Sequence, residues 1–174
     1  YSIGLYSDTW YYWDGKPVVM GYPDNLIRDA ENEEIKAQHQ EILDAIVRKD
    51  TSLAVELMKQ QSEDAKYQII KSARLYRQEI AIAALNNTTS RALAAQAADE
   101  LLNISGITAS FVLYPDGETV YISARSIGEA NVQMILEPLG GGGNTATAGA
   151  QMKNTTVKEA LDRLVESIDK FYEQ

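Results

Sequence analysis

The sequence has 174 residues, 45% hydrophobic and 24% charged, which is enough to bury the core of one ordinary globular domain with a small appendage. Its formal net charge of -9, from 25 acidic and 16 basic side chains, repels polyanions and argues against binding of long DNA or RNA. With no cysteine and a single histidine, His39, the sequence excludes disulfides, thiolate metal sites, a cysteine nucleophile and a multi-histidine metal cluster. We interpret His39 as a solvated or packed side chain.

Membrane signals are also missing from these residues. No stretch of 18 or more apolar residues occurs, and the first residues lack the basic, apolar and small-residue order of a secretory signal. We therefore expect a soluble, cytoplasmic chain, and a membrane anchor elsewhere in a full-length protein would be compatible with it.

The first part of the chain predicts two short strands and two helices. Residues 1–23 are rich in aromatic side chains around the turn-forming pair Asp14-Gly15, which favours a small hairpin. Apolar residues at helical spacing predict a helix from about Asn25 to Lys49, and Asp50 can begin a second one that ends near Arg74. The apolar positions are Ile35, Ile42, Leu43, Ile46 and Val47 in the first helix and Leu53, Leu57, Ile69, Ile70 and Leu75 in the second.

The second part alternates strand and helix signals. Residues 80–85 form a short apolar run typical of a buried strand, and an alanine-rich helix is predicted over 92–102. Strands over 107–114 and 119–125 flank Pro115-Asp116-Gly117, a strong turn signal. A short helix over 129–136, a strand over 146–152 and a last helix capped by residues 154–156 follow. The order predicts a mixed α/β domain, with a central mixed sheet flanked by helices and preceded by a helical arm.

The most informative local signal is the run of four glycines, Gly140, Gly141, Gly142 and Gly143. Without side chains, successive backbone N–H groups can form an anion-binding nest, and a ligand can lie directly against the main chain. Asn144 follows with a polar side chain that can hydrogen-bond a bound group. The run matches neither a P-loop nor a dinucleotide fingerprint, and a flexible linker is the alternative interpretation.

A second signal lies near the end of a predicted strand, at Ser123, Arg125, Ser126 and Asn131. An arginine there can meet a phosphate with two parallel N–H groups, and the hydroxyls and amide can complete a polar pocket. The alternative is an exposed surface arginine, which is the commoner case for a charged side chain.

Six short motifs in order make a family resemblance. The chain over about residues 60–174 resembles the DHH-associated domain, the C-terminal module of DHH phosphoesterases. Among these enzymes, its motifs are most similar to those of the cyclic-di-AMP phosphodiesterases. The motifs are AQAAD at 95–99, GITASFV at 106–112, ISARS at 122–126, GEANVQ at 128–133, LGGGG at 139–143 and AGAQ at 148–151.

The resemblance implies a division of labour between two domains. A DHH domain, absent from these residues, would hold manganese, while this chain would carry no cofactor, no metal ligand and no catalytic residue and would be inactive alone. Its substrate-binding residues would be Ser123, Arg125, Ser126, Asn131, Gly140 to Gly143 and Asn144. The expected partners are cyclic di-AMP or a short oligonucleotide and the DHH domain of the same protein, and a homodimer remains open. The expected organisation is an unassigned segment over 1–50, a connecting helix over 51–78 and the DHH-associated domain over 79–174.

One position departs from the family pattern. Where the family usually has Gly-Gly-Gly-His, this sequence has Asn144, whose amide hydrogen-bonds but cannot transfer a proton at neutral pH. We hypothesise that binding is retained while turnover falls, and that Asn144→His strengthens nucleotide binding. A nucleotide sensor without turnover is therefore an alternative to the phosphodiesterase. A dimerisation module that associates through residues 33–74 is a further alternative.

Overall fold

The computed structural model describes residues 10–13, 16–19, 26–48 and 50–173. They fall into two compact units, the first ending at Ala65 and the second beginning at Lys66. None of the helices in these ranges is long and apolar enough to cross a membrane.

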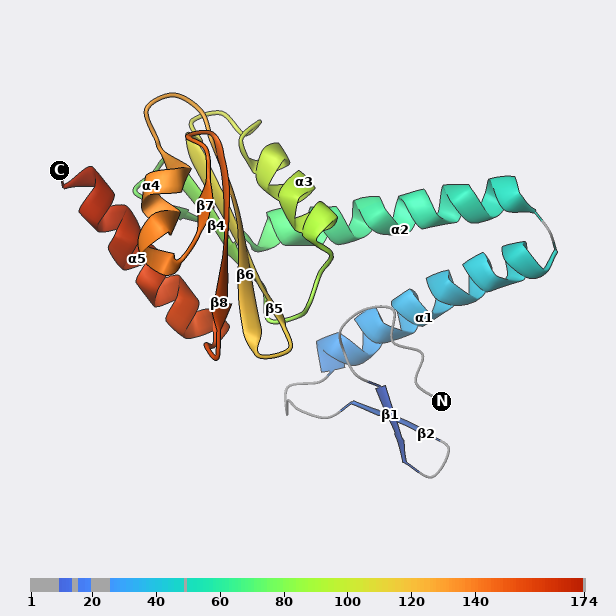
Figure 1. Cartoon of the computed structure of the whole chain (residues 1–174). Helices are drawn as coiled ribbons and strands as arrows, with labels where there is room; N and C mark the ends of the chain where they lie inside the picture. Colours follow the sequence, from blue (N-terminus) through green and yellow to red (C-terminus); the bar gives the residue numbers. More distant parts are fainter. Residues whose placement is uncertain (1–9, 14–15, 20–25, 49, 174) are drawn as a thin grey trace. The chain divides into compact units, whose positions relative to one another are not determined.

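The first unit contains a small hairpin and the helical arm, as the sequence predicts (Figure 1). Strands β1 (Trp10–Trp13) and β2 (Lys16–Val19) pair antiparallel, whereas the turn residues Asp14 and Gly15 lie outside the described residues. Helix α1 (Leu26–Val47) is followed by α2 (Thr51–Ser72), which continues past the end of this unit. Asp50 starts α2 as expected, because its Oδ1 accepts a hydrogen bond from the backbone N–H of Leu53 at 3.0 Å.

The apolar pattern that predicts α1 correctly is only partly buried within the described residues. Ile42 is buried, but Leu43, Ile46 and Val47 are 52%, 55% and 79% exposed. Their spacing therefore indicates the helix without indicating a packed face in this unit.

The second unit is built on a six-stranded mixed sheet in the order β3-β4-β5-β6-β8-β7. Strands β4 and β5 pair in parallel, and every other neighbouring pair is antiparallel. The strands are β3 (Arg74–Tyr76), β4 (Ile80–Ala84), β5 (Ala109–Asp116), β6 (Thr119–Ser126), β7 (Gly142–Gly143) and β8 (Thr147–Lys153).

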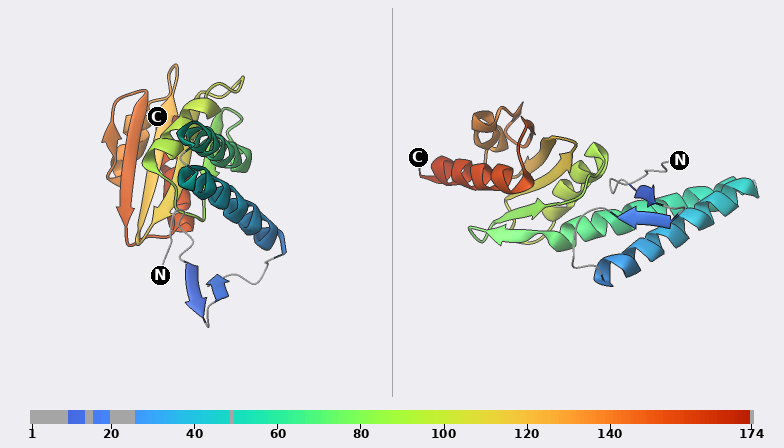
Figure 2. Two further views of the ribbon diagram at one scale, coloured as in Figure 1. Left: turned by 90° about the vertical axis from the view of Figure 1, so that its right-hand side faces the viewer. Right: turned by 90° about the horizontal axis from the view of Figure 1, so that it is seen from below.

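Helices cover the two faces of this sheet differently (Figures 1 and 2). Helix α3 (Arg91–Leu101) packs on one face over β5 and β6, and Ser90 caps it by accepting the N–H of Leu93 at 3.1 Å. The other face carries α4 (Val132–Leu136), the 3-10 turn η1 (Glu137–Leu139) and α5 (Val157–Tyr172). The mixed α/β fold with flanking helices and an N-terminal helical region is confirmed.

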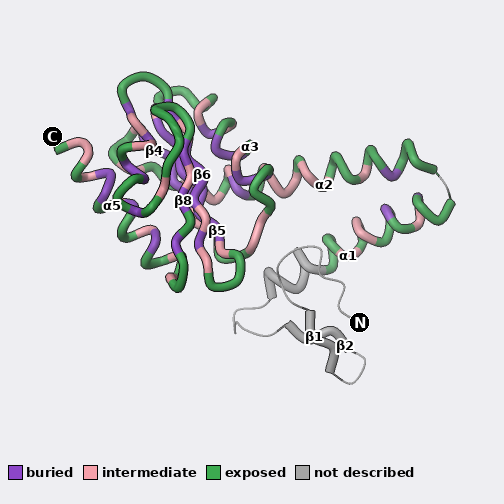
Figure 3. Tube along the Cα trace, viewed as in Figure 1, coloured by how far each residue is buried: buried purple, intermediate pink, exposed green. Residues whose placement is uncertain are grey.

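The main core lies between the sheet and α4/α5. Figure 3 shows buried segments along the strands of the sheet. Side chains alternate along β5, and Phe111 and Leu113 point into this core. Ser110 is buried on the opposite face of the strand, where it contacts α3. The face under α3 is the thinner one: α3 covers β5 and β6, whereas Thr147 and Gln151 of β8 and both residues of β7 are exposed.

Two strands were not expected from the sequence. Strand β3 contains Leu75, which the helical pattern assigned to the second helix and which is 67% exposed at the sheet edge. Strand β7 consists of two glycines, which have no intrinsic preference for a strand. Both are edge strands that exist because a neighbouring strand offers unpaired backbone groups.

The last helix begins with a reciprocal capping box. The Thr156 hydroxyl accepts the N–H of Glu159, and the Glu159 carboxylate accepts the N–H of Thr156 at 2.9 Å. The pKa of Glu159 lies below its ordinary value, chiefly because its carboxylate accepts a hydrogen bond from the Thr156 backbone. Hydrogen bonds from the hydroxyls of Thr156 and Thr155 lower this pKa further.

We expect Thr156→Ala to lower the free energy of unfolding by about 1 kcal/mol, because it leaves an N–H of the first turn without a partner. Because the pKa of Glu159 is lowered in the folded state, its carboxylate contributes fully to stability above its unfolded-state pKa. This contribution to stability is lost as the pH falls through the folded-state pKa of Glu159. Urea denaturation between pH 7 and pH 3 measures both effects. Glu159→Gln is the control, and an acid limb as steep in that variant as in the wild type would contradict the assignment.

Candidate functional site

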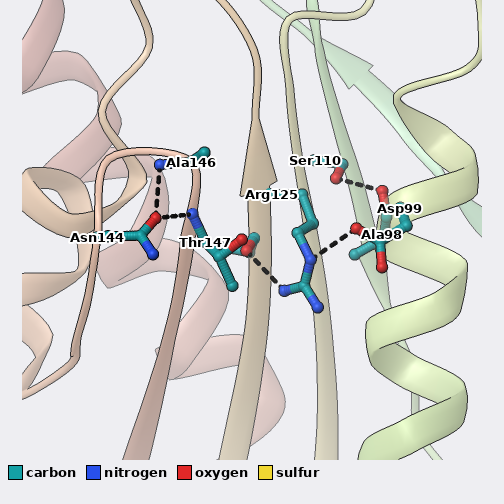
Figure 4. A network of polar contacts seen from close by, with 8 residues as sticks. Ala98, Asp99, Ser110, Arg125, Asn144, Ala146 and Thr147 are labelled. Carbon is teal, nitrogen blue, oxygen red and sulfur yellow. Dashed lines mark hydrogen bonds and ion pairs between the residues drawn. The ribbon is translucent and has the colours of Figure 1, made fainter.

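Arg125 lies on β6 with its side chain on the α3 face of the sheet (Figure 4). Its Nε donates to Asp99 Oδ1 of α3 at 2.7 Å, and its Nη1 donates to the carbonyl oxygen of Ala124 at 3.0 Å. The side chain of Arg125 is 17% exposed and that of Asp99 is 58% exposed. The guanidinium is therefore held from one side and is not a freely moving surface charge.

The position of Asp99 depends on how closely α3 approaches the sheet. Ala94, Ala97 and Ala98 are completely buried, and their small side chains allow this approach. The buried hydroxyl of Ser110 on β5 donates to the carbonyl oxygen of Ala98 at 2.7 Å and so ties the last turn of α3 to the strand beside Arg125 (Figure 4).

The four glycines form an ordered connection between η1 and β8. Gly140 ends η1 with φ +76, and the N–H groups of Gly140 and Gly141 donate to the carbonyl oxygens of Glu137 and Leu136 at 3.0 and 2.9 Å. Gly142 and Gly143 then pair with β8 as the edge strand β7. The flexible-linker interpretation does not describe this structure.

The glycines differ in what a side chain would meet. A Cβ on Gly141 would lie 2.8 Å from Leu136 Cβ, and one on Gly143 would lie 2.2 Å from the carbonyl oxygen of Thr147. A Cβ on Gly142 would meet no atom within 4 Å. Close packing therefore demands glycine at 141 and 143, whereas at 142 the missing side chain leaves an open surface.

Strand register continues this surface onto two neighbouring strands, where Gly149 is half-buried and Ser123 is buried at 9% exposure. Gly142 pairs with Gly149, and Gly149 pairs with Ser123, so the three residues form one row on the same side of the sheet. We name this row, Ser123-Gly149-Gly142, the bare strip. At a strand spacing of about 4.8 Å it spans roughly 10 Å. Arg125 and its cross-strand partner Thr147 stand one step along the strands, at the edge of the strip.

Asn144 shapes the turn that ends this edge. Its side-chain oxygen accepts the backbone N–H groups of Ala146 and Thr147 at 3.0 and 2.9 Å (Figure 4). Its backbone N–H donates to the carbonyl oxygen of Thr147 at 2.7 Å. The oxygen is thus used within the turn, which leaves the amide N–H₂ of this exposed residue for a ligand.

Two of the predicted site residues make hydrogen bonds inside the fold. Ser126 is 4% exposed, and its hydroxyl donates to the carbonyl oxygen of Thr145 at 2.8 Å. Asn131 caps α4 by accepting the N–H of Met134 at 3.2 Å. Both support the Asn144 turn or the helix behind it, and a direct role for them in binding stays a prediction.

The structure brings Ser123, Arg125 and Gly142 together, and it adds three residues that were not predicted as site residues. Gly149, Thr147 and Asp99 share the same face with them. Gly149 and Asp99 belong to the quoted sequence motifs, and the alternation of side chains along the strand over 146–152 was the available signal for Thr147.

An aromatic pair lies on the same face beyond the bare strip. Tyr121, two residues from Ser123, stacks on Tyr114 with ring centroids 5.5 Å apart. Burial raises the pKa of Tyr114 above its ordinary value, so this phenol is neutral at physiological pH. Among the residues that the structure describes, no three His, Cys, Asp or Glu side chains gather where they could hold a metal ion.

Comparison with protein families gives a match over residues 77–174 to the DHHA1 domain, the DHH-associated domain. The chain belongs to this family. The bare strip, Arg125 and Asp99 all lie within the matched DHHA1 residues, and so does the whole sheet from β4 onward.

Relatives in the DHHA1 family include two cyclic-di-AMP phosphodiesterases. The chain is 42% identical over 131 residues to GdpP of Bacillus subtilis and 38% identical over 129 residues to PdeA of Listeria monocytogenes, with 71% of this chain and 20% of each relative covered. The chain thus spans about a fifth of the length of these relatives.

A solved structure shares the fold. An exopolyphosphatase-related protein from Bacteroides fragilis superposes with a TM-score of 0.57 at 17% identity, over 71% of this chain and 44% of that one. This likeness concerns the fold alone.

Proposed function

We propose that this chain is the substrate-binding part of a phosphodiesterase that hydrolyses cyclic di-AMP or a short oligonucleotide. The observation that carries the proposal is the bare strip with Arg125 at its edge, on a domain whose relatives are named cyclic-di-AMP phosphodiesterases. Two glycines and one small serine side chain beside a guanidinium leave room for a flat ligand that carries phosphate.

The residues would act by binding and orienting the ligand. Arg125 would bind a phosphate with two parallel N–H groups, since guanidinium and phosphate match in geometry. The strip would let the ligand lie against the backbone, and Thr147 and the Asn144 amide would supply further hydrogen-bonding groups at its edge. Holding a reactant in the productive orientation accounts for a large part of the barrier reduction in many enzymes.

The metal chemistry would belong to another domain. The described residues do not fit a manganese site, because they bring together no suitable group of ligands. We propose that a DHH domain of the same protein holds manganese. Two such ions would activate water and stabilise the displacement at phosphorus.

Asn144 favours a second candidate function, a nucleotide sensor without turnover. Its amide cannot become a charged proton donor as an imidazole can, and its oxygen is already used by the turn. Such a domain would bind the ligand and lack the group that a histidine supplies.

The two functions separate in one experiment. We expect the 174-residue chain to bind cyclic di-AMP in an NMR titration, and a longer protein containing a DHH domain to hydrolyse it with manganese. Binding without hydrolysis would favour the sensor, and hydrolysis gained by Asn144→His would identify Asn144 as the cause. If neither the chain nor the longer protein binds cyclic di-AMP or the linear dinucleotide, both functions are wrong.

A further inference from the structure

We propose that Asp99 is a positioning residue that fixes the plane of the Arg125 guanidinium, so that Arg125 meets a ligand phosphate end-on through Nη1 and Nη2. This inference deepens the proposed function and rests on it. It assigns to α3 a part in substrate binding, through a residue that need not touch the substrate.

Two N–H groups of the Arg125 guanidinium are already used for hydrogen bonds within the fold. A guanidinium has five N–H donors, and a phosphate pairs with two parallel ones, either Nε with Nη2 or Nη1 with Nη2. Nε already donates to Asp99 at 2.7 Å, and one N–H of Nη1 donates to the carbonyl oxygen of Ala124 at 3.0 Å. The Nε edge is therefore occupied, and the end-on pair is the one that remains for an anion.

Asp99 is held in place by the attachment of α3 to the sheet. The residue lies in the last turn of α3, and the Ser110 hydroxyl binds the carbonyl oxygen of the preceding residue, Ala98, at 2.7 Å. Ser110 is completely buried on β5, next to β6, which carries Arg125. The carboxylate is thus positioned by the core of the domain even though its own side chain is 58% exposed.

The Asp99 carboxylate has two opposing effects on the binding of a phosphate by Arg125. The Asp99 carboxylate orders Arg125 but also places a negative charge near the phosphate site, which weakens the attraction for an anion. A pair of variants separates these effects. Asp99→Asn removes the charge and keeps an oxygen that accepts from Nε, whereas Asp99→Ala removes both.

The test is an NMR titration of the whole 15N-labelled chain with cyclic di-AMP. We expect Asp99→Asn to bind as tightly as the wild type or up to about threefold more tightly, because one repelling charge is gone. We expect Asp99→Ala to bind at least about fivefold more weakly than Asp99→Asn, because the guanidinium loses its fixed plane. The Nε–H signal of Arg125 should be protected from water exchange in the wild type and in Asp99→Asn and lost in Asp99→Ala.

Glu100→Gln is the matched control, because it removes the same charge one residue further along and its side chain pairs with Lys66 at 2.6 Å. Equal dissociation constants for Asp99→Asn and Asp99→Ala would overturn the positioning role while leaving the proposed function intact. So would loss of the protected Nε–H signal when ligand is added to the wild type, since the phosphate would then have displaced Asp99. A wild-type chain that binds no ligand would overturn the proposed function and this inference together.

Discussion

Replacing Gly142 by alanine is expected to weaken binding of cyclic di-AMP by about tenfold or more without changing the stability of the domain. The new methyl group would meet no atom of the protein within 4 Å, so we expect the free energy of unfolding to stay within about 0.5 kcal/mol of wild type. The same methyl group would stand in the bare strip and hold a flat ligand away from the backbone, where contacts weaken steeply with distance.

The neighbouring glycines should behave in the opposite way. A Cβ on Gly143 would lie 2.2 Å from the carbonyl oxygen of Thr147 and 2.6 Å from the Cα of Ala148, and both are backbone atoms that cannot move aside alone. We expect Gly143→Ala to lower the free energy of unfolding by about 3 kcal/mol, as overpacking does. Gly141→Ala, with Leu136 Cβ at 2.8 Å, should be destabilised in the same direction.

Urea denaturation and ligand titration on the three alanine variants measure both properties. Wild-type affinity in Gly142→Ala would show that the ligand does not lie on the bare strip. A Gly143→Ala variant as stable as the wild type would contradict the close packing of β7 on β8.

Substitution of Arg125 by methionine is expected to weaken cyclic di-AMP binding by roughly thirtyfold, which corresponds to about 2 kcal/mol. The substitution keeps the apolar stem and removes the charge and every N–H donor to a phosphate. Because the Asp99 side chain is 58% exposed, water can solvate it once its partner is gone, and the fold should tolerate the change.

Two further variants control this prediction. Arg125→Lys keeps the charge but loses the planar fork, so its affinity should fall between those of the wild type and Arg125→Met. Arg163→Met removes an equal charge from the exposed surface of α5, on the opposite face of the sheet, and should bind as the wild type does. A dissociation constant unchanged in Arg125→Met would remove Arg125 from the site.

The sequence by itself determined the elements whose signals are local. The Pro115-Asp116-Gly117 segment between two apolar runs predicts the β5–β6 hairpin, in which Pro115 and Asp116 pair with β6 and Gly117 and Glu118 form the turn itself. Thr156 with Glu159 specifies the start of α5, because a cap, like a turn, depends only on residues close in the chain. The family, and with it the α/β fold, followed from short motifs in their order.

Tertiary structure decided which residues share the site and what each glycine does. Arg125 and Asp99 are 26 residues apart, and their contact depends on the seating of α3 against the sheet. Gly141, Gly142 and Gly143 look the same in the sequence. In the structure a Cβ on Gly142 would face open surface, whereas a Cβ on Gly141 or Gly143 would meet packed atoms, because successive residues point to opposite faces of a sheet. Such distinctions arise from pairing between distant segments, which no local pattern contains.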